Sequence, residues 1–236
     1  MEILDGVRAI IFDVDGTLYD KRAVQRRLAF RIAAAYWSRP VKGVRVVQGL
    51  QAYRQAHEDL RAQVFSPGLQ LALAAKKSGY EVSELRGIVD EWFERAPLRL
   101  MSQCVYPKLP QLLRLLSERR IPCGVFSDYP AQAKLTAMGL EGFFSHVLCA
   151  AEVGRLKPDP SGILLLANQI GLTPKRTLYV GDRTIDLEAA ARAGMRGLLI
   201  GGKTTYSMLL HRLLLLGDRE GAAAQPASPR IHFPWR

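Results

Sequence analysis

Long apolar runs are absent from this sequence of 236 residues, and that absence argues against a membrane-spanning protein. Residues 28–37 and 208–216 are the most hydrophobic stretches, but both are short, contain arginine and fall below the roughly 20 apolar residues that cross a bilayer. The N-terminus also lacks a basic region followed by an apolar segment, so we expect no secretory signal, no membrane partner and a cytoplasmic location.

Cysteine is scarce as well, with only Cys104, Cys123 and Cys149 and no C-x-x-C spacing. This odd set predicts neither a disulfide framework nor a thiolate metal site, so we expect three small buried hydrophobic residues. Acidic residues are outnumbered by basic ones, 22 to 33, and the net charge of +11 favours anionic partners. Residues 20–107 hold 15 basic and 8 acidic residues, so much of the excess lies in one segment.

Short apolar runs alternate with amphipathic ones along most of the chain, and 48% of its residues are hydrophobic, which indicates a folded α/β protein. We predict strands at residues 8–12, 121–126, 147–149, 177–180 and 197–200. Helices are predicted at residues 109–119, 131–138, 163–170 and 186–193. The alternation predicts a Rossmann-like parallel sheet with helices on both faces and with ligands at the carboxyl ends of the strands.

Residues 20–107 break this alternation, because they show helical periodicity without strands, at residues 23–37, 49–64, 69–77 and 83–95. We interpret them as an α-helical cap domain, bounded by the turn after Gly16 and by Pro97 and Pro107, that is inserted after the first strand and can lie over the catalytic mouth. The α/β core then comprises residues 1–19 and 108–216. Residues 217–236, rich in Ala, Pro and Ser, are predicted to be a tail without a core of its own.

The first strand ends at two carboxylates, Asp13 and Asp15, which an extended chain places on the same side. Gly16 then allows a tight turn of the backbone, and Asp182 and Asp186 follow the fourth strand at the same edge of the sheet. Clustered carboxylates without His or Cys nearby favour a hard cation, so the sequence predicts Mg²⁺ as cofactor.

Four motifs follow the expected strands in order: Asp13-Val-Asp-Gly-Thr, Ser127, Lys157 in Lys-Pro-Asp-Pro, and Gly181-Asp-Arg-Thr-Ile-Asp. Over residues 8–202 this set resembles the haloacid-dehalogenase-like (HAD) hydrolase superfamily. The helical insert resembles the cap of its phosphoglycolate-phosphatase-like branch. The resemblance implies a Mg²⁺-dependent phosphatase that hydrolyses a small phosphorylated metabolite through an aspartyl-phosphate intermediate.

The resemblance also implies how the carboxylates would work. Asp13 would attack phosphorus, and Asp15 would protonate the leaving alcohol and then deprotonate the attacking water. Mg²⁺ would be bound by the carboxylates of Asp13 and Asp182 and by the backbone carbonyl of Asp15, which leaves the Asp15 side chain free to carry a proton. Each of these aspartates could instead be an ordinary turn or capping residue.

Phosphate binding is implied for Ser127 and Lys157, and Asp186 would orient Lys157 or a metal-bound water. These residues have structural interpretations too: Ser127 as a turn residue, Lys157 as a solvated lysine and Asp186 as a charge at a helix start. Asp128 precedes Tyr129-Pro130 and a helical run, so we interpret it mainly as a helix cap whose N–H lies near phosphate.

Basic residues of the cap fall into two groups, Arg22, Arg26, Arg27 and Arg31, and then Arg54, His57 and Arg61. Either group would contact an acidic part of the substrate or form a solvated face. No aromatic platform or nucleic-acid motif accompanies them, so nucleic acid is not an expected partner. The leucines at 209, 210 and 213–216 would form a dimer face or dock on their own core, which leaves the oligomeric state open.

Other activities of the superfamily depend on the residue at position 15. Its dehalogenases have tyrosine there and its phosphonatases have alanine, so Asp15 disfavours both. A sugar-phosphate mutase keeps both aspartates and stays a possible activity. A non-catalytic interaction module that uses the basic cap is the alternative outside enzymes. Tyr19 departs from the aliphatic residue usual in the phosphoglycolate-type branch, which leaves the substrate open.

Overall fold

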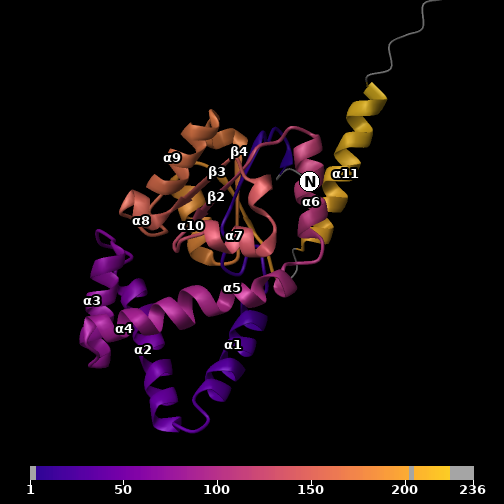
Figure 1. Cartoon of the computed structure of the whole chain (residues 1–236). Helices are drawn as coiled ribbons and strands as arrows, with labels where there is room; N and C mark the ends of the chain where they lie inside the picture. The colour runs from indigo at the N-terminus through magenta and orange to yellow at the C-terminus, as the bar shows by residue number, and fades with distance from the viewer. Residues whose placement is uncertain (1–3, 202–204, 224–236) are drawn as a thin grey trace, which may run out of the picture.

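A five-stranded parallel sheet with the strand order β3-β2-β1-β4-β5 forms the centre of the molecule (Figure 1). The structure is a computed structural model that describes residues 4–201 and 205–223. The strands are β1 (Ala9–Phe12), β2 (Cys123–Ser127), β3 (His146–Cys149), β4 (Thr177–Gly181) and β5 (Arg196–Leu199). All five predicted strands are present to within a few residues at their ends. The predicted fold class is confirmed.

Helices cover both faces of the sheet, as continuously apolar parallel strands require. The core helices are α6 (Leu109–Glu118), α7 (Gln132–Met138), α8 (Ala150–Val153), α9 (Ser161–Ile170), α10 (Thr184–Arg192) and α11 (Tyr206–Ala223). Consecutive residues of β1 point to opposite faces: Ile10 and Phe12 pack with α6, α7 and α11, and Ile11 packs with α9 and α10. The carboxyl edge of the strands is left for the functional side chains.

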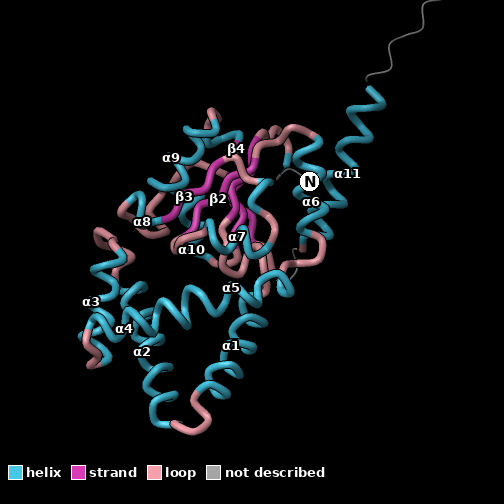
Figure 2. Tube along the Cα trace, viewed as in Figure 1, coloured by secondary structure: helices cyan, strands magenta, loops and turns pink. Residues whose placement is uncertain are grey.

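The cap consists of helices that lie together at one end of the sheet (Figures 1 and 2). They are α1 (Lys21–Ala35), α2 (Pro40–Asp59), α3 (Pro67–Ser78), α4 (Val82–Val89) and α5 (Ala96–Met101), and a π-helical turn (Asp90–Arg95) joins α4 to α5. An isolated antiparallel bridge between Tyr19 and Val105 ties together the chain entering and leaving the cap. The proposed domain boundaries at residues 20 and 107 stay a prediction.

Three helix boundaries in the cap were predicted wrongly, and one of them is the end of α2, which lies at Asp59 rather than at residue 64. Helix α2 begins at Pro40 rather than at residue 49, because Pro40 suits a first helical turn and Gly43 lets the helix pass close to Tyr36. A Cβ on Gly43 would lie 2.9 Å from the Cβ of Tyr36. The helical run also continues through Pro97 to Met101, since the π-helical turn before it already departs from regular α-helical bonding.

The C-terminal helix α11 packs on the same face of the sheet as α6 and α7. Leu209 and Leu213 are buried in the same cluster as β1 and α6, which supports docking on the chain's own core for these two leucines. The helix runs to Ala223, past residue 217 where the tail was predicted to begin, and residues 224–236 lie outside the described residues. Among the described residues no helix is both long and apolar enough to cross a membrane. The three cysteines are buried and unpaired, as predicted.

Candidate active site

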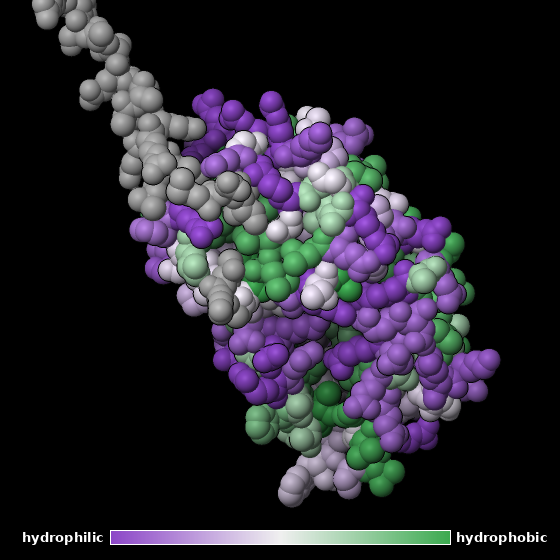
Figure 3. Space-filling model, turned by 180° about the vertical axis from the view of Figure 1, so that it is seen from behind, coloured by the Kyte–Doolittle hydropathy of each residue, from purple (hydrophilic) through white to green (hydrophobic). Residues whose placement is uncertain are grey.

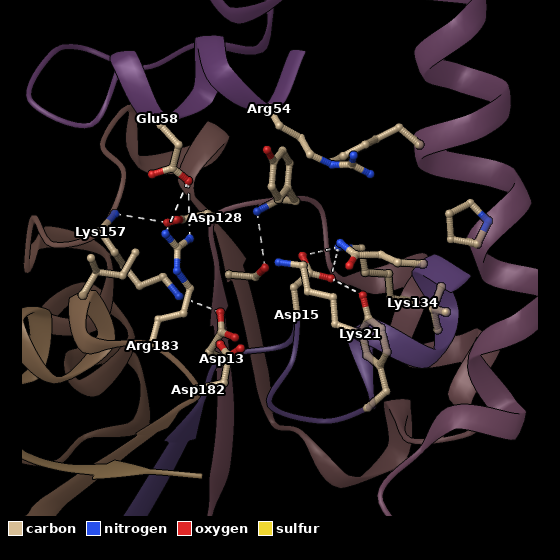
Figure 4. A pocket seen from close by; sticks show the side chains of 18 of the residues that line it. Asp13, Asp15, Lys21, Arg54, Glu58, Asp128, Lys134, Lys157, Asp182 and Arg183 are labelled. Carbon is tan, nitrogen blue, oxygen red and sulfur yellow. Dashed lines mark hydrogen bonds and ion pairs between the residues drawn. The ribbon is translucent and has the colours of Figure 1, made fainter. Parts of the chain in front are cut away.

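The carboxyl ends of β1, β2 and β4 bring the predicted residues to one edge of the sheet. Asp13 follows β1, Ser127 ends β2 and Asp182 follows β4, and Figure 4 shows Asp13 and Asp182 side by side. Gly16 makes this approach possible, because its φ is +99° and a Cβ there would lie 2.1 Å from Asp182 Oδ2. The glycine of the first motif is therefore required by the neighbouring aspartate as well as by the turn.

Lys157 links the first and last motifs in the interior of the site. Its Nζ donates to Asp13 Oδ1 at 2.6 Å and to Asp186 Oδ1 at 2.7 Å, and all three residues are buried. Thr17 Oγ1 donates to the other oxygen, Asp13 Oδ2, at 3.0 Å, while the backbone N–H of Arg183 donates to Asp186 Oδ2 at 3.0 Å. Lys157 is thus a buried ion-pair partner and not a solvated lysine.

Asp13, Asp182 and Asp186 form a cluster with the composition of a cation site. One carboxylate oxygen of each lies within 4.8 Å of the others. Asp182 Oδ1 is buried and has no hydrogen-bond partner among the described residues, which is costly unless a further group binds it. Lys157 pairs with two of the three carboxylates, those of Asp13 and Asp186, and all ligand atoms are oxygens. These features fit Mg²⁺, which prefers carboxylate oxygens.

The electrostatics of the cluster reflect this crowding. Burial raises the pKa of Asp13 to about 7; the charge of Lys157 opposes this rise, and Asp186 and Asp15 add to it. Burial and the charge of Asp186 also raise the pKa of Asp182. A divalent cation near these groups would favour their ionised forms, since nearby positive charge lowers a carboxyl pKa.

Asp15 lies apart from this cluster, with its carboxylate turned toward α7 and the start of the cap. Lys134 Nζ lies 2.7 Å from Asp15 Oδ1 and 2.5 Å from Oδ2, and the Tyr19 hydroxyl donates to Oδ1 at 2.6 Å. Burial alone would raise the pKa of Asp15, but the charges of Lys134 and Lys21 and the two hydrogen-bond donors together lower it. The contacts with Lys134 and Tyr19 therefore favour the ionised form of Asp15. The binding of its backbone carbonyl to a metal stays a prediction.

Asp128 does not cap the following helix, so that interpretation was wrong. Helix α7 begins at Gln132 and has no side-chain cap. The Asp128 carboxylate instead accepts the backbone N–H of Lys157 at 3.1 Å and Arg61 Nη1 at 2.7 Å. Arg61 Nη1 also donates to the carbonyl of Lys157 at 2.8 Å. Arg61, just beyond the cap helix α2, is thereby bonded to the Lys157 carbonyl directly and to the Lys157 N–H through Asp128.

Ser127 is buried at the end of β2, where its Oγ accepts the backbone N–H of Tyr129 at 3.3 Å. That contact is the turn contact considered for it, and the same hydroxyl also borders a cavity of about 430 Å³ between the cap and the sheet. Arg54 borders the cavity from α2, and Trp92 and Phe93 come from the π-helical turn. The cavity joins the carboxylates to a wall of mixed aromatic and basic character.

The two basic groups of the cap have different surroundings. The residues Arg22, Arg26 and Arg27 are exposed and do not border the cavity, so they form a solvated face. The second group faces the core: His57 is buried and stacks on Tyr129 with ring centroids 4.2 Å apart, and Arg61 pairs with Asp128. Arg54 points over the carboxylates in Figure 4 and has no carboxylate partner within the part of the chain that the structure describes.

Sequence reasoning missed Lys134 and the pairing partners of the cap. Lys134 lies one turn into a correctly predicted helix, so only the packing of α7 beside β1 brings it to Asp15. Glu58 accepts from Arg61 Nη2 at 2.9 Å and from Arg183 Nη1 at 3.4 Å, which connects α2 to the loop after β4. An acidic residue three positions before Arg61 was the available signal for the first pair. No local signal marked the second.

Comparison with known proteins places this arrangement in a family. A sequence model of the haloacid dehalogenase-like hydrolases matches residues 7–194, so the chain belongs to that family and is a hydrolase. The phosphoglycolate phosphatase of Shigella boydii serotype 4 is 25% identical over 209 residues, covering 82% of this chain and 81% of that enzyme.

Solved structures agree on the fold. The 2-haloacid dehalogenase of Pseudomonas syringae pv. Tomato has a TM-score of 0.62 at 21% identity, covering 89% of this chain and 99% of that one. A predicted phosphoglycolate phosphatase of Haemophilus somnus has a TM-score of 0.59 at 22% identity, covering 85% and 88%. At these identities the likeness is one of fold alone.

Proposed function

We propose that this hydrolase is a Mg²⁺-dependent phosphatase that acts on a small phosphorylated metabolite, with Asp13 as nucleophile. The observation that carries the proposal is Asp15: a carboxylate stands beside the nucleophile, where dehalogenases of the family have tyrosine, and Lys134 and Tyr19 fix its position. The phosphatase names of relatives about 25% identical support the same choice. The dehalogenase structures share the fold and carry no argument about the reaction.

Hydrogen bonds to both of its oxygens fix the position of the Asp13 carboxylate. Lys157 holds Oδ1 and Thr17 holds Oδ2, so the carboxylate has little freedom to rotate. Lys157 also carries the positive charge nearest the nucleophile, where it would stabilise charge on a transferring phosphoryl group. Burial opposes that charge, but the carboxylates of Asp13, Asp128 and Asp186 raise the pKa of Lys157 well above its ordinary value and keep it protonated.

Asp13 and Asp182 would hold Mg²⁺ together with the backbone carbonyl of Asp15, and Asp186, in the same cluster, would orient Lys157. When bound, Mg²⁺ would neutralise charge on phosphoryl oxygens. Asp15 would give a proton to the leaving oxygen and later take one from water. Its lowered pKa makes it a carboxylate in the structure, so the first role requires a proton that the Lys134 and Tyr19 contacts disfavour and the second role does not. The observed geometry of Asp15 therefore suits hydrolysis of the intermediate better than protonation of the leaving group.

Rapid acid quench with labelled phosphomonoesters separates the roles of the two carboxylates. We expect Asp13→Asn to form no phosphoenzyme and to show no turnover, because the nucleophile is lost. Asp15→Asn should still be phosphorylated by an aryl phosphate, whose leaving group needs little protonation, and then release phosphate about 10²- to 10⁴-fold more slowly. With an alkyl phosphate the same variant should form little intermediate.

Wild-type turnover of alkyl and aryl phosphates by Asp15→Asn, or labelling of Asp13→Asn, would contradict the assignment. Free phosphate released without product recycling separates a phosphatase from the alternative sugar-phosphate mutase. No phosphate release from any phosphomonoester by the wild-type chain with Mg²⁺ would favour the alternative of a non-catalytic interaction module.

A further inference from the structure

The end of the cap that lies farthest from the sheet exposes large apolar side chains. We call residues 30–47 the hairpin tip; they contain the last turns of α1, the connection between the helices and the first turns of α2. Trp37 is 87% exposed, Phe30 78%, Val41 76% and Val44 58%. Figures 1 and 2 show this connection at the bottom of the molecule, and Figure 3 shows apolar atoms there beside hydrophilic ones.

Helix periodicity explains why these residues point outward. Helix α2 buries Gly43 and Val46 against the rest of the cap, so Val41 and Val44, one turn apart, lie on its opposite side. Phe30 lies opposite the buried residues of α1 in the same way. At about 1.5 Å of rise per residue, all of them lie within about 10 Å of the connection along their helix axes. The apolar residues thus gather at one protruding end.

The same hairpin carries positive charge alone. Residues 21–57 contain nine lysines and arginines and no aspartate or glutamate: Lys21, Arg22, Arg26, Arg27, Arg31, Arg39, Lys42, Arg45 and Arg54. None of the nine forms an ion pair with a carboxylate in residues 4–201 and 205–223. Arg39 and Lys42 are exposed at the tip itself and flank Trp37 and Val41 in sequence. The tip therefore combines apolar side chains with cations that lack a counterion in the fold.

The positive charge of the hairpin tip distinguishes among the partners that could bind it. A second copy of the tip would cover the apolar residues but bring two all-cationic hairpins together, which like-charge repulsion opposes. A nucleic acid would pair with the cations but leave aliphatic valines without an apolar partner. An anionic lipid surface satisfies both, since acyl chains and headgroups accept Trp, Phe and Val while anionic headgroups pair with Arg and Lys.

We propose that the hairpin tip binds peripherally to the surface of an anionic lipid bilayer, with Trp37, Val41 and Val44 at the level of the headgroups and acyl boundary and with Arg39 and Lys42 paired to lipid phosphates or carboxylates. The expectation of no membrane partner rested on the absence of spanning segments, which peripheral binding does not need. Binding at the tip uses none of the residues assigned to catalysis. It is independent of whether the enzyme is a phosphatase.

Vesicle flotation with the full chain tests the proposal. We expect binding to phosphatidylcholine vesicles that contain phosphatidylserine, little binding to pure phosphatidylcholine, and weaker binding as salt rises, because screening shortens the reach of the cations. The double variant Trp37→Ser with Val41→Ser should bind at least about tenfold more weakly, since two apolar side chains no longer enter the interface. Arg39→Glu with Lys42→Glu should abolish binding.

A matched control carries the same change of charge away from the tip. Lys175 and Arg176 are exposed in a turn just before β4, at the opposite edge of the sheet from the cap, and Lys175→Glu with Arg176→Glu should keep nearly all the binding. All variants should have wild-type circular dichroism, because the replaced side chains are exposed. No binding of the wild-type chain to anionic vesicles at low salt would overturn the proposal. Equal loss in the control would overturn it too, since net charge alone would then explain binding.

Two further outcomes would assign the tip to another partner. A wild-type dimer in light scattering that becomes a monomer in Trp37→Ser with Val41→Ser would assign it to a second copy of the chain. Binding to single-stranded RNA that is lost in Arg39→Glu with Lys42→Glu, together with absent vesicle binding, would assign it to nucleic acid. Either result overturns the membrane proposal.

Discussion

The two ends of helix α2 have opposite environments. Near its start, Val41 and Val44 face solvent and Lys42 has no acidic partner in the described chain. Near its end, His57 is buried, and Arg61, just beyond the helix, bonds to core residues. Because, among the described residues, only the second end is bonded to the core, contact there positions the cap over the candidate active site. The first end remains free to contact something else.

At the second end of α2, which we call the docked end, the residues of the cap and of the core bond to several partners each, and these contacts support one another. Asp128 receives hydrogen bonds from Arg61 of the cap and from the backbone of Lys157, and Arg61 also bonds to the Lys157 carbonyl. Phe65, a few residues further on, donates its N–H to Gly154 O at 2.9 Å and packs into the core cluster. Apolar burial and a satisfied polar network occur at the same place, so the cap is anchored at this corner.

Among the variants that test the difference between the two ends of α2, Asp128→Ala should have the largest effect on stability. The substitution leaves the buried Lys157 N–H without its acceptor and removes one of the acceptors of the mostly buried Arg61 guanidinium. We expect a loss of about 3 kcal/mol in the free energy of unfolding, measured by urea denaturation at neutral pH. Asp128→Asn is the control: it keeps one carbonyl oxygen as an acceptor and should lose less. Equal urea midpoints for Asp128→Ala and the wild type would show that the network does not hold the cap.

The pKa of Asp128 predicts how the difference in stability between the wild type and Asp128→Asn depends on pH. Burial would raise that pKa, but the charge of Lys157 and the contacts with His57 and Arg61 outweigh it and lower the pKa well below its usual value. A lowered pKa means that the contribution is present above the unfolded value of about 3.9 and is lost as pH falls toward the folded value. The stability difference between wild type and Asp128→Asn should therefore be full at about pH 6 and smaller at about pH 3.

This docked corner also shows where prediction from sequence ends. The residues Asp13, Asp182 and Asp186 could be placed together because each follows a strand whose parallel neighbours share one edge. Placing these residues together requires only that each follows a strand and that the strands run parallel in one sheet. The pairing of Arg61 with Asp128 joins residues 67 positions apart on different parts of the fold, and no periodicity encodes it.

The start of α2 was also missed, since the predicted helix began only at residue 49. Four valines and Gly43 between residues 41 and 47 have weak helical propensity. Packing of Gly43 and Val46 on the cap overrides that propensity. The two misses have a common cause: tertiary contacts decide both, and one sequence without its fold does not contain them.

An intermediate effect is expected from a matched pair of arginines in α2 and the turn after it. Arg61→Ala removes two bonds to the core and should cost about 1–2 kcal/mol of stability. Arg54 is exposed, and its guanidinium lies 5.6 Å from the centroid of the Phe93 ring. Arg54→Ala should leave stability within about 0.5 kcal/mol of the wild type. It should raise KM about tenfold for a phosphomonoester with a remote anionic group and leave a neutral aryl phosphate unchanged.

Thermal unfolding and steady-state kinetics on both substrates check this pair, and Arg61→Lys is the conservative control that keeps the charge. Equal losses for the two substrates in Arg54→Ala would mean that Arg54 does not contact the substrate's remote part. A loss of stability in Arg54→Ala as large as in Arg61→Ala would contradict the distinction between the two arginines.

The smallest effect is expected from Val44→Ala at the free end of α2, and Val46, two positions further on and in opposite surroundings, gives the comparison. Val46 is 1% exposed and packs in the cap, whereas Val44 is 58% exposed. Val46→Ala should cost about 2 kcal/mol, because a buried cavity is left behind. Val44→Ala should change the free energy of unfolding by no more than about 0.5 kcal/mol, since alanine's higher helix propensity offsets the little packing that is lost. Urea denaturation of both variants, with turnover of a neutral aryl phosphate unchanged in Val44→Ala, makes the comparison. A large loss of stability in Val44→Ala would mean that this face of α2 is covered in solution by contact with another molecule, most simply a second copy, and would count against a free hairpin tip.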